Sequence, residues 1–357
     1  MSHPVCAYLY VMERQEPQGK SEPLQINGLP ISFFQEPILQ QAVFNKHDIP
    51  NDQDGFWQNP ALWSASFFVG TPLECMVLMF LFEPTERQWQ DFQESNSILG
   101  KEAQKHIRSL VKNATAFSLN GFPSLRACWF ESADPNETLS PLLSRISLFL
   151  RGSKTLTTDS LARLDGHDAL FDSSGFAVVS EQNRIKNNPD AQLVHFLRML
   201  IASALMQAYF HVIETACRQI AADLMQPGKK SSSLIDLYEQ VTCFNAAQYF
   251  SRPIKRGSTL IKRFWDALAG YEDLQGYHQE MVVQLREVSQ LLAAREREAN
   301  ERFRAEEREA RENLEKIEQA SNDRINRKLT ILGLVITVLL GWEPVVQAMQ
   351  WLSHLLG

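Results

Sequence analysis

The sequence lacks the residue excesses that mark several whole classes of protein. Its 357 residues include five cysteines, and no two of them stand in a Cys-x-x-Cys spacing. This argues against a disulfide framework and against a structural zinc site. The formal net charge is -7, so the chain has no basic excess for binding nucleic acid. With 44% hydrophobic and 22% charged residues, it has the composition of a globular protein.

The sequence also lacks the short motifs of common enzyme classes. It contains no Gly-x-Ser-x-Gly, His-Glu-x-x-His or dinucleotide-binding glycine pattern. We therefore expect a protein that is not an enzyme. Residues 1–12 lack the basic start and the long apolar run of a secretory signal. We accordingly expect the N-terminal bulk of the chain to be cytoplasmic.

The first half of the chain alternates strand-like and helix-like segments, which predicts an α+β fold. Residues 6–11 and 125–130 are rich in strand formers, and the nearly all-apolar run 73–82 suits a buried strand. Residues 85–111 are polar and helical, whereas residues 165–175 have the composition of a loop. We expect residues 1–188 to form one cytosolic α/β domain.

From residue 189 onward the strand pattern disappears. Residues 193–225 form a long apolar helical run, but His195, Arg198 and further polar residues recur along it. The run is therefore predicted to be a buried helix rather than a membrane span. With shorter helices expected over 233–250 and 258–271, residues 189–282 are predicted to form a helical domain.

Residues 283–328 are dense in charge and balanced in sign. They contain 11 acidic and 11 basic residues, and neither proline nor glycine. Three i,i+4 pairs stand in the favourable order, each worth about 0.3 kcal/mol: Glu298–Arg302, Glu307–Arg311 and Glu312–Lys316. This pattern predicts one long charged stalk helix.

An apolar residue recurs every 11 positions along the stalk. This row, which we call the stalk seam, comprises Met281, Leu292, Phe303, Leu314, Ile325 and Ile336. Because a step of 11 residues corresponds to about 3.67 residues per turn, the row stays nearly straight along a helix. The seam predicts packing against further copies of the chain or against the helical domain. The alternative is a solvated single helix whose period arises by chance.

Residues 329–357 carry one charged side chain, that of Glu343. As a helix, residues 329–342 would reach about 21 Å and all of 329–357 about 43 Å, against a hydrocarbon core of about 30 Å. Arg324, Arg327 and Lys328 precede the run, and such residues mark the cytoplasmic flank of membrane helices. We predict a C-terminal membrane tail in an inner or plasma membrane, with the stalk in the cytosol.

Three arrangements of this tail stay open. One span kinked at Pro344 would cross the bilayer and bury Glu343 near its middle, which is costly unless that face lines an assembly. A half-span followed by an interfacial helix would place residues 342–344 at a surface or in a re-entrant turn. A soluble helix packed on the core is the third arrangement. The candidate membrane or pore residues are Gly341, Trp342, Glu343 and Pro344, with Glu343 forming a ring in an oligomer.

A second candidate site lies in the N-terminal domain. The expected loop at 165–175 contains Asp165, His167, Asp168 and Asp172. Carboxylate and imidazole groups of this kind bind divalent cations. Their spacing differs from that of a calcium-binding loop, so a solvated turn is the alternative. Apart from a divalent cation at this loop, we expect no cofactor.

The segment at the start of the tail resembles the CorA-like metal-ion transporters. The likeness rests on Asn-Arg-Lys-Leu-Thr-Ile at residues 326–331, where a basic flank precedes a Leu-Thr step. It implies a cytosolic α/β domain, a helical layer, a long stalk and an oligomeric membrane part. The Gly-Met-Asn signature of that family is replaced by Gly341-Trp342-Glu343, and residues 345–357 are too short for a second span. The resemblance therefore implies architecture rather than cation selectivity.

These observations lead to two hypotheses of function. In the first, the chain is a membrane-anchored homo-oligomer whose cytosolic domain senses an unidentified ligand or protein trigger and acts through the stalk on an ion pathway. In the second, it is a tail-anchored scaffold, or a stress or defence effector, that does not conduct. Both hypotheses have the lipid membrane as a partner and exclude nucleic acid.

Overall fold

The structure is a computed structural model in which the chain forms two compact units, Met1–Val288 and Ser289–Gly357. The fold is α+β, as the sequence predicts, with one large mixed sheet and a long C-terminal helix. The residues described are 4–13, 20–49, 56–94, 101–115, 117, 119, 121–132, 139–153, 155, 161–164, 166–181, 190–225 and 231–355.

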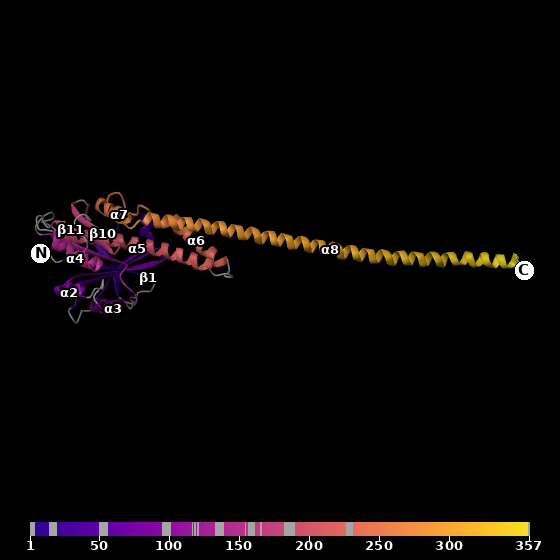
Figure 1. The fold of residues 1–357 in the computed structure, drawn as a ribbon, viewed down its shortest axis with the longest axis horizontal. Coiled ribbons are helices and arrows are strands. Elements are labelled where there is room, and N and C mark those ends of the chain that lie inside the picture. Colours follow the sequence, from indigo (N-terminus) through magenta and orange to yellow (C-terminus); the bar gives the residue numbers. More distant parts are fainter. Residues whose placement is uncertain are drawn as a thin grey trace. The chain divides into compact units, whose positions relative to one another are not determined.

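A nine-stranded sheet forms the centre of the first unit (Figure 1). Its strand order is β2-β5-β6-β7-β1-β8-β11-β10-β9, and its pairings are antiparallel except for that of β8 with β11. The strands β3 (Gln25–Ile26) and β4 (Leu29–Pro30) pair separately. The nine strands are β1 Val5–Glu13, β2 Ser21–Pro23, β5 Ala42–His47, β6 Gln58–Phe67, β7 Cys75–Glu83, β8 Leu125–Ser132, β9 Leu161–Leu164, β10 His167–Asp172 and β11 Gly175–Glu181.

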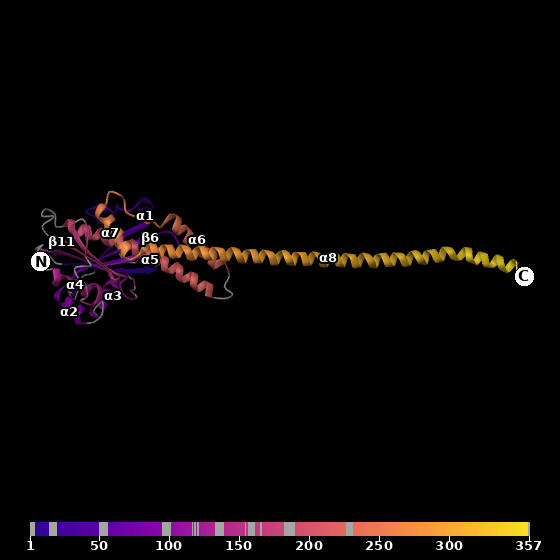
Figure 2. The ribbon, with the colours of Figure 1, turned by 45° about the horizontal axis from the view of Figure 1, so that its top comes forward.

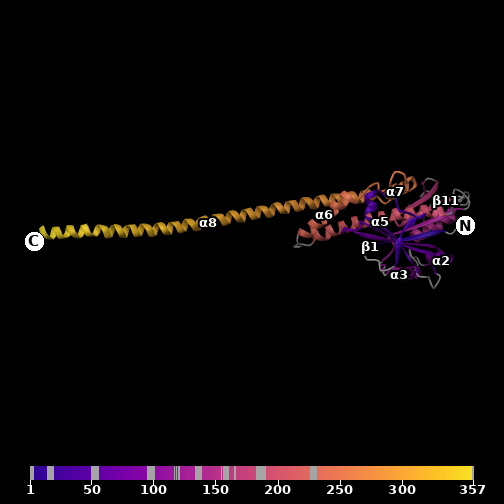
Figure 3. The same cartoon turned by 180° about the vertical axis from the view of Figure 1, so that it is seen from behind.

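Helices cover both faces of the sheet. The bounds of the described helices are α1 Glu36–Gln40, α2 Glu86–Glu94, α3 Lys101–Thr115, α4 Leu139–Arg151, α5 Asp190–Met225, α6 Ser231–Ala247, α7 Thr259–Tyr271 and α8 Leu274–Leu355. Helices α2, α3 and α4 lie on one face, and α5 and α7 lie on the other (Figures 2 and 3). This two-sided cover explains why the central strands β7 and β1 are apolar along nearly their whole length.

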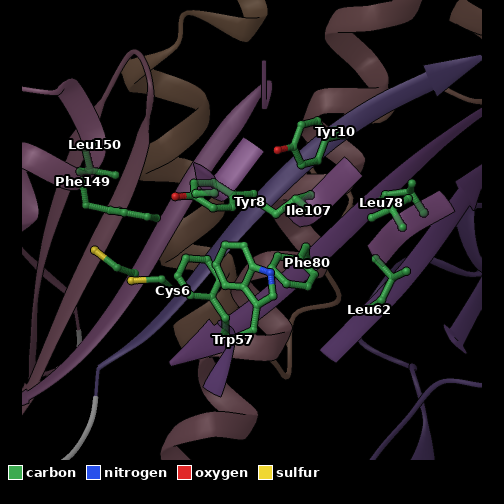
Figure 4. Packing of buried hydrophobic residues seen from close by; sticks show 14 of the residues in the cluster. Cys6, Tyr8, Tyr10, Trp57, Leu62, Leu78, Phe80, Ile107, Phe149 and Leu150 are labelled. Atoms are coloured by element: carbon green, nitrogen blue, oxygen red, sulfur yellow. The ribbon is translucent and has the colours of Figure 1, made fainter. Parts of the chain in front are cut away.

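The face under α2, α3 and α4 holds the larger hydrophobic cluster of the first unit. Tyr8 of β1 and Phe80 of β7 pack there with Ile107 of α3 and Phe149 of α4 (Figure 4). Tyr8 and Phe80 are register partners, and their strand neighbours in the cluster stand at alternate positions, as expected for side chains on the same face of a sheet: Cys6 and Tyr10 of β1, and Leu78 and Phe82 of β7. Trp57, just before β6, joins the cluster edge-on to the Phe80 ring, with 4.9 Å between centroids.

On the opposite face of the sheet, small side chains allow α5 to pack closely. The strands carry the fully buried small residues Ala7, Ala65 and Ala127, above which α5 packs against β1, β6, β7 and β8. Phe196 of α5 meets Phe176 of β11, with 6.3 Å between ring centroids. The apolar run of residues 193–225 is thus largely buried on the sheet, as the polar residues along it predict.

The one parallel pairing of the sheet depends on a glycine. Gly175 begins β11 opposite Arg126 of β8 and has a φ of 151°. A Cβ atom at this position would lie 1.7 Å from the carbonyl oxygen of Arg126. Only glycine permits so close an approach of two backbones. The edge formed by β9, β10 and β11 can therefore join β8 only with glycine at this position.

The prediction of a loop over residues 165–175 is wrong. Strand β10 occupies His167–Asp172 and β11 begins at Gly175, so only a short turn separates them. The segment looked like a loop because polar residues stand at both ends of β10. Those residues are buried: His167 is 6% exposed and packs on Trp129, and Asp172 is 1% exposed and forms an ion pair. Polarity here reflects satisfied interior contacts rather than exposure to solvent.

The first turns of α8 belong to the first unit. Met281 and Val288 are buried there, and the ring of His278 stacks on Tyr249 with 3.6 Å between centroids. The Nε2 atom of His278 lies 2.9 Å from Oδ1 of Asn245 on α6. Both segments that we expected as the first two domains, residues 1–188 and 189–282, lie within this unit. The expected limits at residues 188, 282 and 328 stay predictions.

Candidate membrane tail and stalk

The C-terminal end of α8 has an extended, exposed apolar surface. Large apolar side chains are exposed from Leu329 to Leu355, among them Leu340 at 73% and Trp351 at 70%. Exposing apolar surface to water costs roughly 25 cal/mol per Å². Soluble monomers rarely leave so extended an apolar surface open. This surface is therefore the candidate interaction site of the second unit.

Two described helices are long and apolar enough to cross a membrane by length and composition, and burial separates them. In α5 the most apolar window has a mean hydropathy of 1.4, and 72% of it is buried. In α8 the corresponding value is 2.0, and none of that window is buried. Because α5 uses its apolar side chains in the core of the first unit, the end of α8 is the better candidate for a membrane segment.

Helix α8 continues through Pro344 to Leu355. Proline has no N–H group, so the helical hydrogen bond to the carbonyl of Leu340 is lost there. At 1.5 Å per residue, residues 329–355 extend over about 40 Å, which exceeds a hydrocarbon core of about 30 Å. Glu343 stands about 21 Å beyond Leu329 on the same scale, nearer to the middle of such a core than to its far side. The residues Gly341, Trp342, Glu343 and Pro344 are all exposed.

The stalk seam passes from the interior of the first unit to an open helix surface. Met281 is buried and Leu292 is half-buried. Phe303 is 66% exposed and Leu314 is 63% exposed, and Ile325 and Ile336 are also exposed. The seam beyond Leu292 thus presents exposed apolar side chains along the surface of α8.

Ion pairs support part of the charged stalk. Glu298 and Arg302 lie 3.9 Å apart, and Glu307 and Arg311 lie 2.7 Å apart. The third expected pair, Glu312–Lys316, is not formed among the described residues. Exposed pairs of this kind contribute about 0.5 kcal/mol or less. The charges therefore serve mainly to keep the helix soluble, and the seam carries its capacity for packing.

The three basic residues before the tail differ from the paired charges of the stalk. Arg324, Arg327 and Lys328 are exposed and form no ion pair with any described residue. Asp323 is the last acidic residue before them, and Glu343 is the next acidic residue after them. The start of the apolar run thus has a local excess of positive charge.

The structure does not bring the described members of the predicted cation site together. His167 points to the sheet face of α5 and α7, where it meets Trp129 with 5.4 Å between ring centroids. Asp168 and Asp172 stand on the opposite face, because successive residues of β10 alternate. Among the described residues, no group of three His, Cys, Asp or Glu side chains is arranged to hold a metal ion. Asp165 lies outside the described residues.

A polar cluster at the end of the sheet was missed by the sequence reasoning. Asp172 forms a buried ion pair with Arg151, the last residue of α4. Arg126 of β8 is 4% exposed and donates from Nη1 to the carbonyl oxygen of Phe149 over 3.1 Å. Burial lowers the pKa of Arg126, and its charge faces the negative end of the α4 dipole. A lone arginine inside the apolar segment 125–130 was the available signal, and its role is to fix α4 to the sheet.

Comparisons with models of protein families, with curated proteins and with solved structures found no match for this chain.

Proposed function

We propose that this chain is a membrane-anchored, oligomeric protein of CorA-like build. Its cytosolic N-terminal unit senses a ligand or a protein partner and acts through the stalk on an ion pathway in the membrane. The observation that carries the proposal is the uncovered apolar end of α8, residues 329–355. Insertion into a bilayer removes this surface from water and suits its length of about 40 Å.

A single tilted or kinked span is the tail arrangement that fits the helix best. The alternative of a half-span with an interfacial helix requires a turn at residues 342–344, where α8 is continuous. A soluble packed helix would have to bury the apolar side chains of residues 329–355, which are exposed along the helix. In a single span that starts at Leu329, Trp351 falls beyond the far edge of the hydrocarbon, where tryptophan is favoured.

The exposed seam supports an oligomer of this chain. Phe303, Leu314 and Ile325 form a nearly straight apolar row on an otherwise charged helix. Packing this row against the same row in other copies removes it from water. An oligomer also gives Glu343 an environment other than lipid, because intramembrane carboxylates face bundle interiors or water-filled cavities. A ring of Glu343 side chains is then the element through which ions pass.

The second candidate function is a tail-anchored scaffold or effector that does not conduct. It is favoured by the extent of the tail, since residues 329–355 provide one spanning helix. The CorA-like proteins that the chain resembles have two spans and a Gly-Met-Asn signature, which Gly341-Trp342-Glu343 replaces. A single anchor of this kind is sufficient to hold the first unit at a membrane.

An ion-flux assay in liposomes separates the two functions. The full chain should carry cation flux, and Glu343→Gln should reduce it about tenfold, as expected when roughly 1.4 kcal/mol of favourable charge interaction is lost. The matched control Glu318→Gln, which makes the same change in the stalk, should leave the flux intact. Fully incorporated wild-type protein that carries no flux with any cation or ligand would support the scaffold instead.

A further inference from the structure

Three cations stand together where the stalk meets the tail. Arg324, Arg327 and Lys328 occupy i, i+3 and i+4 positions of α8, which places them within one sector of the helix. We call them the basic cluster. All three side chains are exposed, so their charged ends are available to a partner.

The basic cluster has one acidic neighbour, Asp323, which immediately precedes Arg324; among the described residues no ion pair joins Asp323 to the cluster. The nearest stalk ion pair, Glu307–Arg311, lies 13 residues before Arg324, about 20 Å along the helix. No acidic residue follows the cluster until Glu343. Three cations beside this single carboxylate leave a local excess of positive charge for anions from outside the chain, and the apolar tail indicates where those anions are found.

The depth of the basic cluster matches that of lipid headgroups. Arg324 precedes Leu329 by five residues, or about 7 Å of helix. The headgroup layer on each side of the hydrocarbon core is about 5 to 7 Å thick. When Leu329 enters the hydrocarbon, the three cations are therefore level with phosphates. Guanidinium groups suit this setting because their planar N–H groups can bind two phosphate oxygens at once.

The opposite end of the tail lacks any such charge. Residues 345–355 contain no lysine or arginine, and they include Trp351. The two leaflets would therefore meet very different surfaces, one with three cations and one without a formal charge. An anionic leaflet on the stalk side stabilises one orientation of the tail and leaves the reverse orientation unsupported.

From this arrangement we infer that the basic cluster binds the headgroups of anionic phospholipids and selects the leaflet that faces the stalk. This rests on the proposed membrane insertion of the tail and goes beyond it by naming the lipid class. The inference holds whether or not the protein conducts ions. The contact is electrostatic, so it weakens as ionic strength rises.

The test is a competition between two vesicle populations of different density. Full-length protein is transferred from detergent into an equal mixture of phosphatidylcholine vesicles and vesicles that also contain phosphatidylserine, and flotation separates the two. Each cation near an anionic surface contributes about 1 kcal/mol, so recovery with the anionic vesicles should exceed recovery with the neutral ones by roughly 100-fold at low salt. The ratio should fall towards one when salt is added.

Two variants make the result specific to the basic cluster. Arg324→Gln/Arg327→Gln/Lys328→Gln should distribute almost equally between the vesicles. Arg295→Gln/Arg297→Gln/Arg304→Gln removes the same charge from exposed stalk positions at least about 30 Å away, beyond screening range, and should keep the wild-type ratio. Equal distribution of the wild-type protein between both populations would overturn the lipid inference and leave membrane insertion standing. Recovery with neither population would instead refute the insertion on which it rests.

Discussion

At the scale of single residues, Glu272 carries a carboxyl group where its charge is unfavourable. It caps the C-terminus of α7, where its backbone N–H donates to the carbonyl oxygen of Leu268 over 3.0 Å. Burial, and then the nearby carboxylate of Asp172, raise the pKa of Glu272. Because the pKa in the folded state lies above the unfolded value, the folded state binds the proton more tightly. Protonation as the pH falls through the folded pKa therefore stabilises the fold.

Replacing Glu272 by glutamine should stabilise the protein near pH 7. The amide keeps the shape of the side chain without its charge, and the free energy of unfolding should rise by about 0.5 kcal/mol. The gain should shrink as the pH falls through the folded pKa of Glu272, because the wild-type carboxyl is then protonated. Chemical denaturation in detergent at several pH values measures this. Glu287→Gln, at an exposed position of α8, should have no effect, and a gain from Glu272→Gln that is constant with pH would contradict the explanation.

The identities of neighbouring residues in the sequence did not predict which side chains come together in the sheet. Asp165, His167, Asp168 and Asp172 are neighbours in sequence, and their ligand chemistry suggested one cation site. Strand alternation separates His167 from Asp168 and Asp172, and it could have been anticipated only if β10 had been recognised. Its ends are polar because Asp172 meets Arg151 from a distant helix, a contact that no local pattern shows.

At the scale of elements, the stalk seam makes a direct prediction about assembly. Phe303→Glu/Leu314→Glu should convert the oligomer into smaller species, because four or more carboxylates would then be pressed together in an apolar contact. Mass measurement in detergent, for example by light scattering, gives the result. The predicted change is a fall in the number of protomers with the helical content unchanged.

A control on the other side of the same helix separates packing from net charge. Ala305→Glu/Gln319→Glu adds the same two charges about half a turn away from the seam, at exposed positions. It should leave the mass unchanged. If the wild-type protein is monomeric in every detergent tried, both the proposed oligomer and the proposed conducting assembly are contradicted.

Elements with strong local patterns were predictable. The apolar run at 73–82 became β7, a central strand covered on both faces, and the uninterrupted helical run at 193–225 became α5. The region 85–111 was predicted to be polar and helical, and the structure has the helices α2 and α3 there. The charge pattern of the stalk, with its i,i+4 pairs, predicted one continuous helix. Helix α8 is continuous through this whole charged segment.

At the scale of the whole molecule, the order of the strands could not have been read from the sequence. The pairing of β11 with β8 is parallel and joins segments about 50 residues apart, with helix α4 between them. It also needs the close backbone approach at Gly175, which composition does not reveal. The difference between the buried helix α5 and the exposed tail, however, could be predicted from the sequence. Polar residues recur along α5, whereas Glu343 is the one charged residue of the tail.

The membrane insertion of residues 329–355 is tested most directly by alkaline carbonate extraction of cell membranes that contain the full chain. Wild-type protein should stay in the membrane pellet. Leu339→Arg/Leu340→Arg should release it, because each arginine near the centre of a membrane helix costs about 2.5 to 3.5 kcal/mol. Ala305→Arg/Gln319→Arg adds the same charge to the stalk and should stay in the pellet. Release of the wild-type protein into the supernatant would contradict insertion.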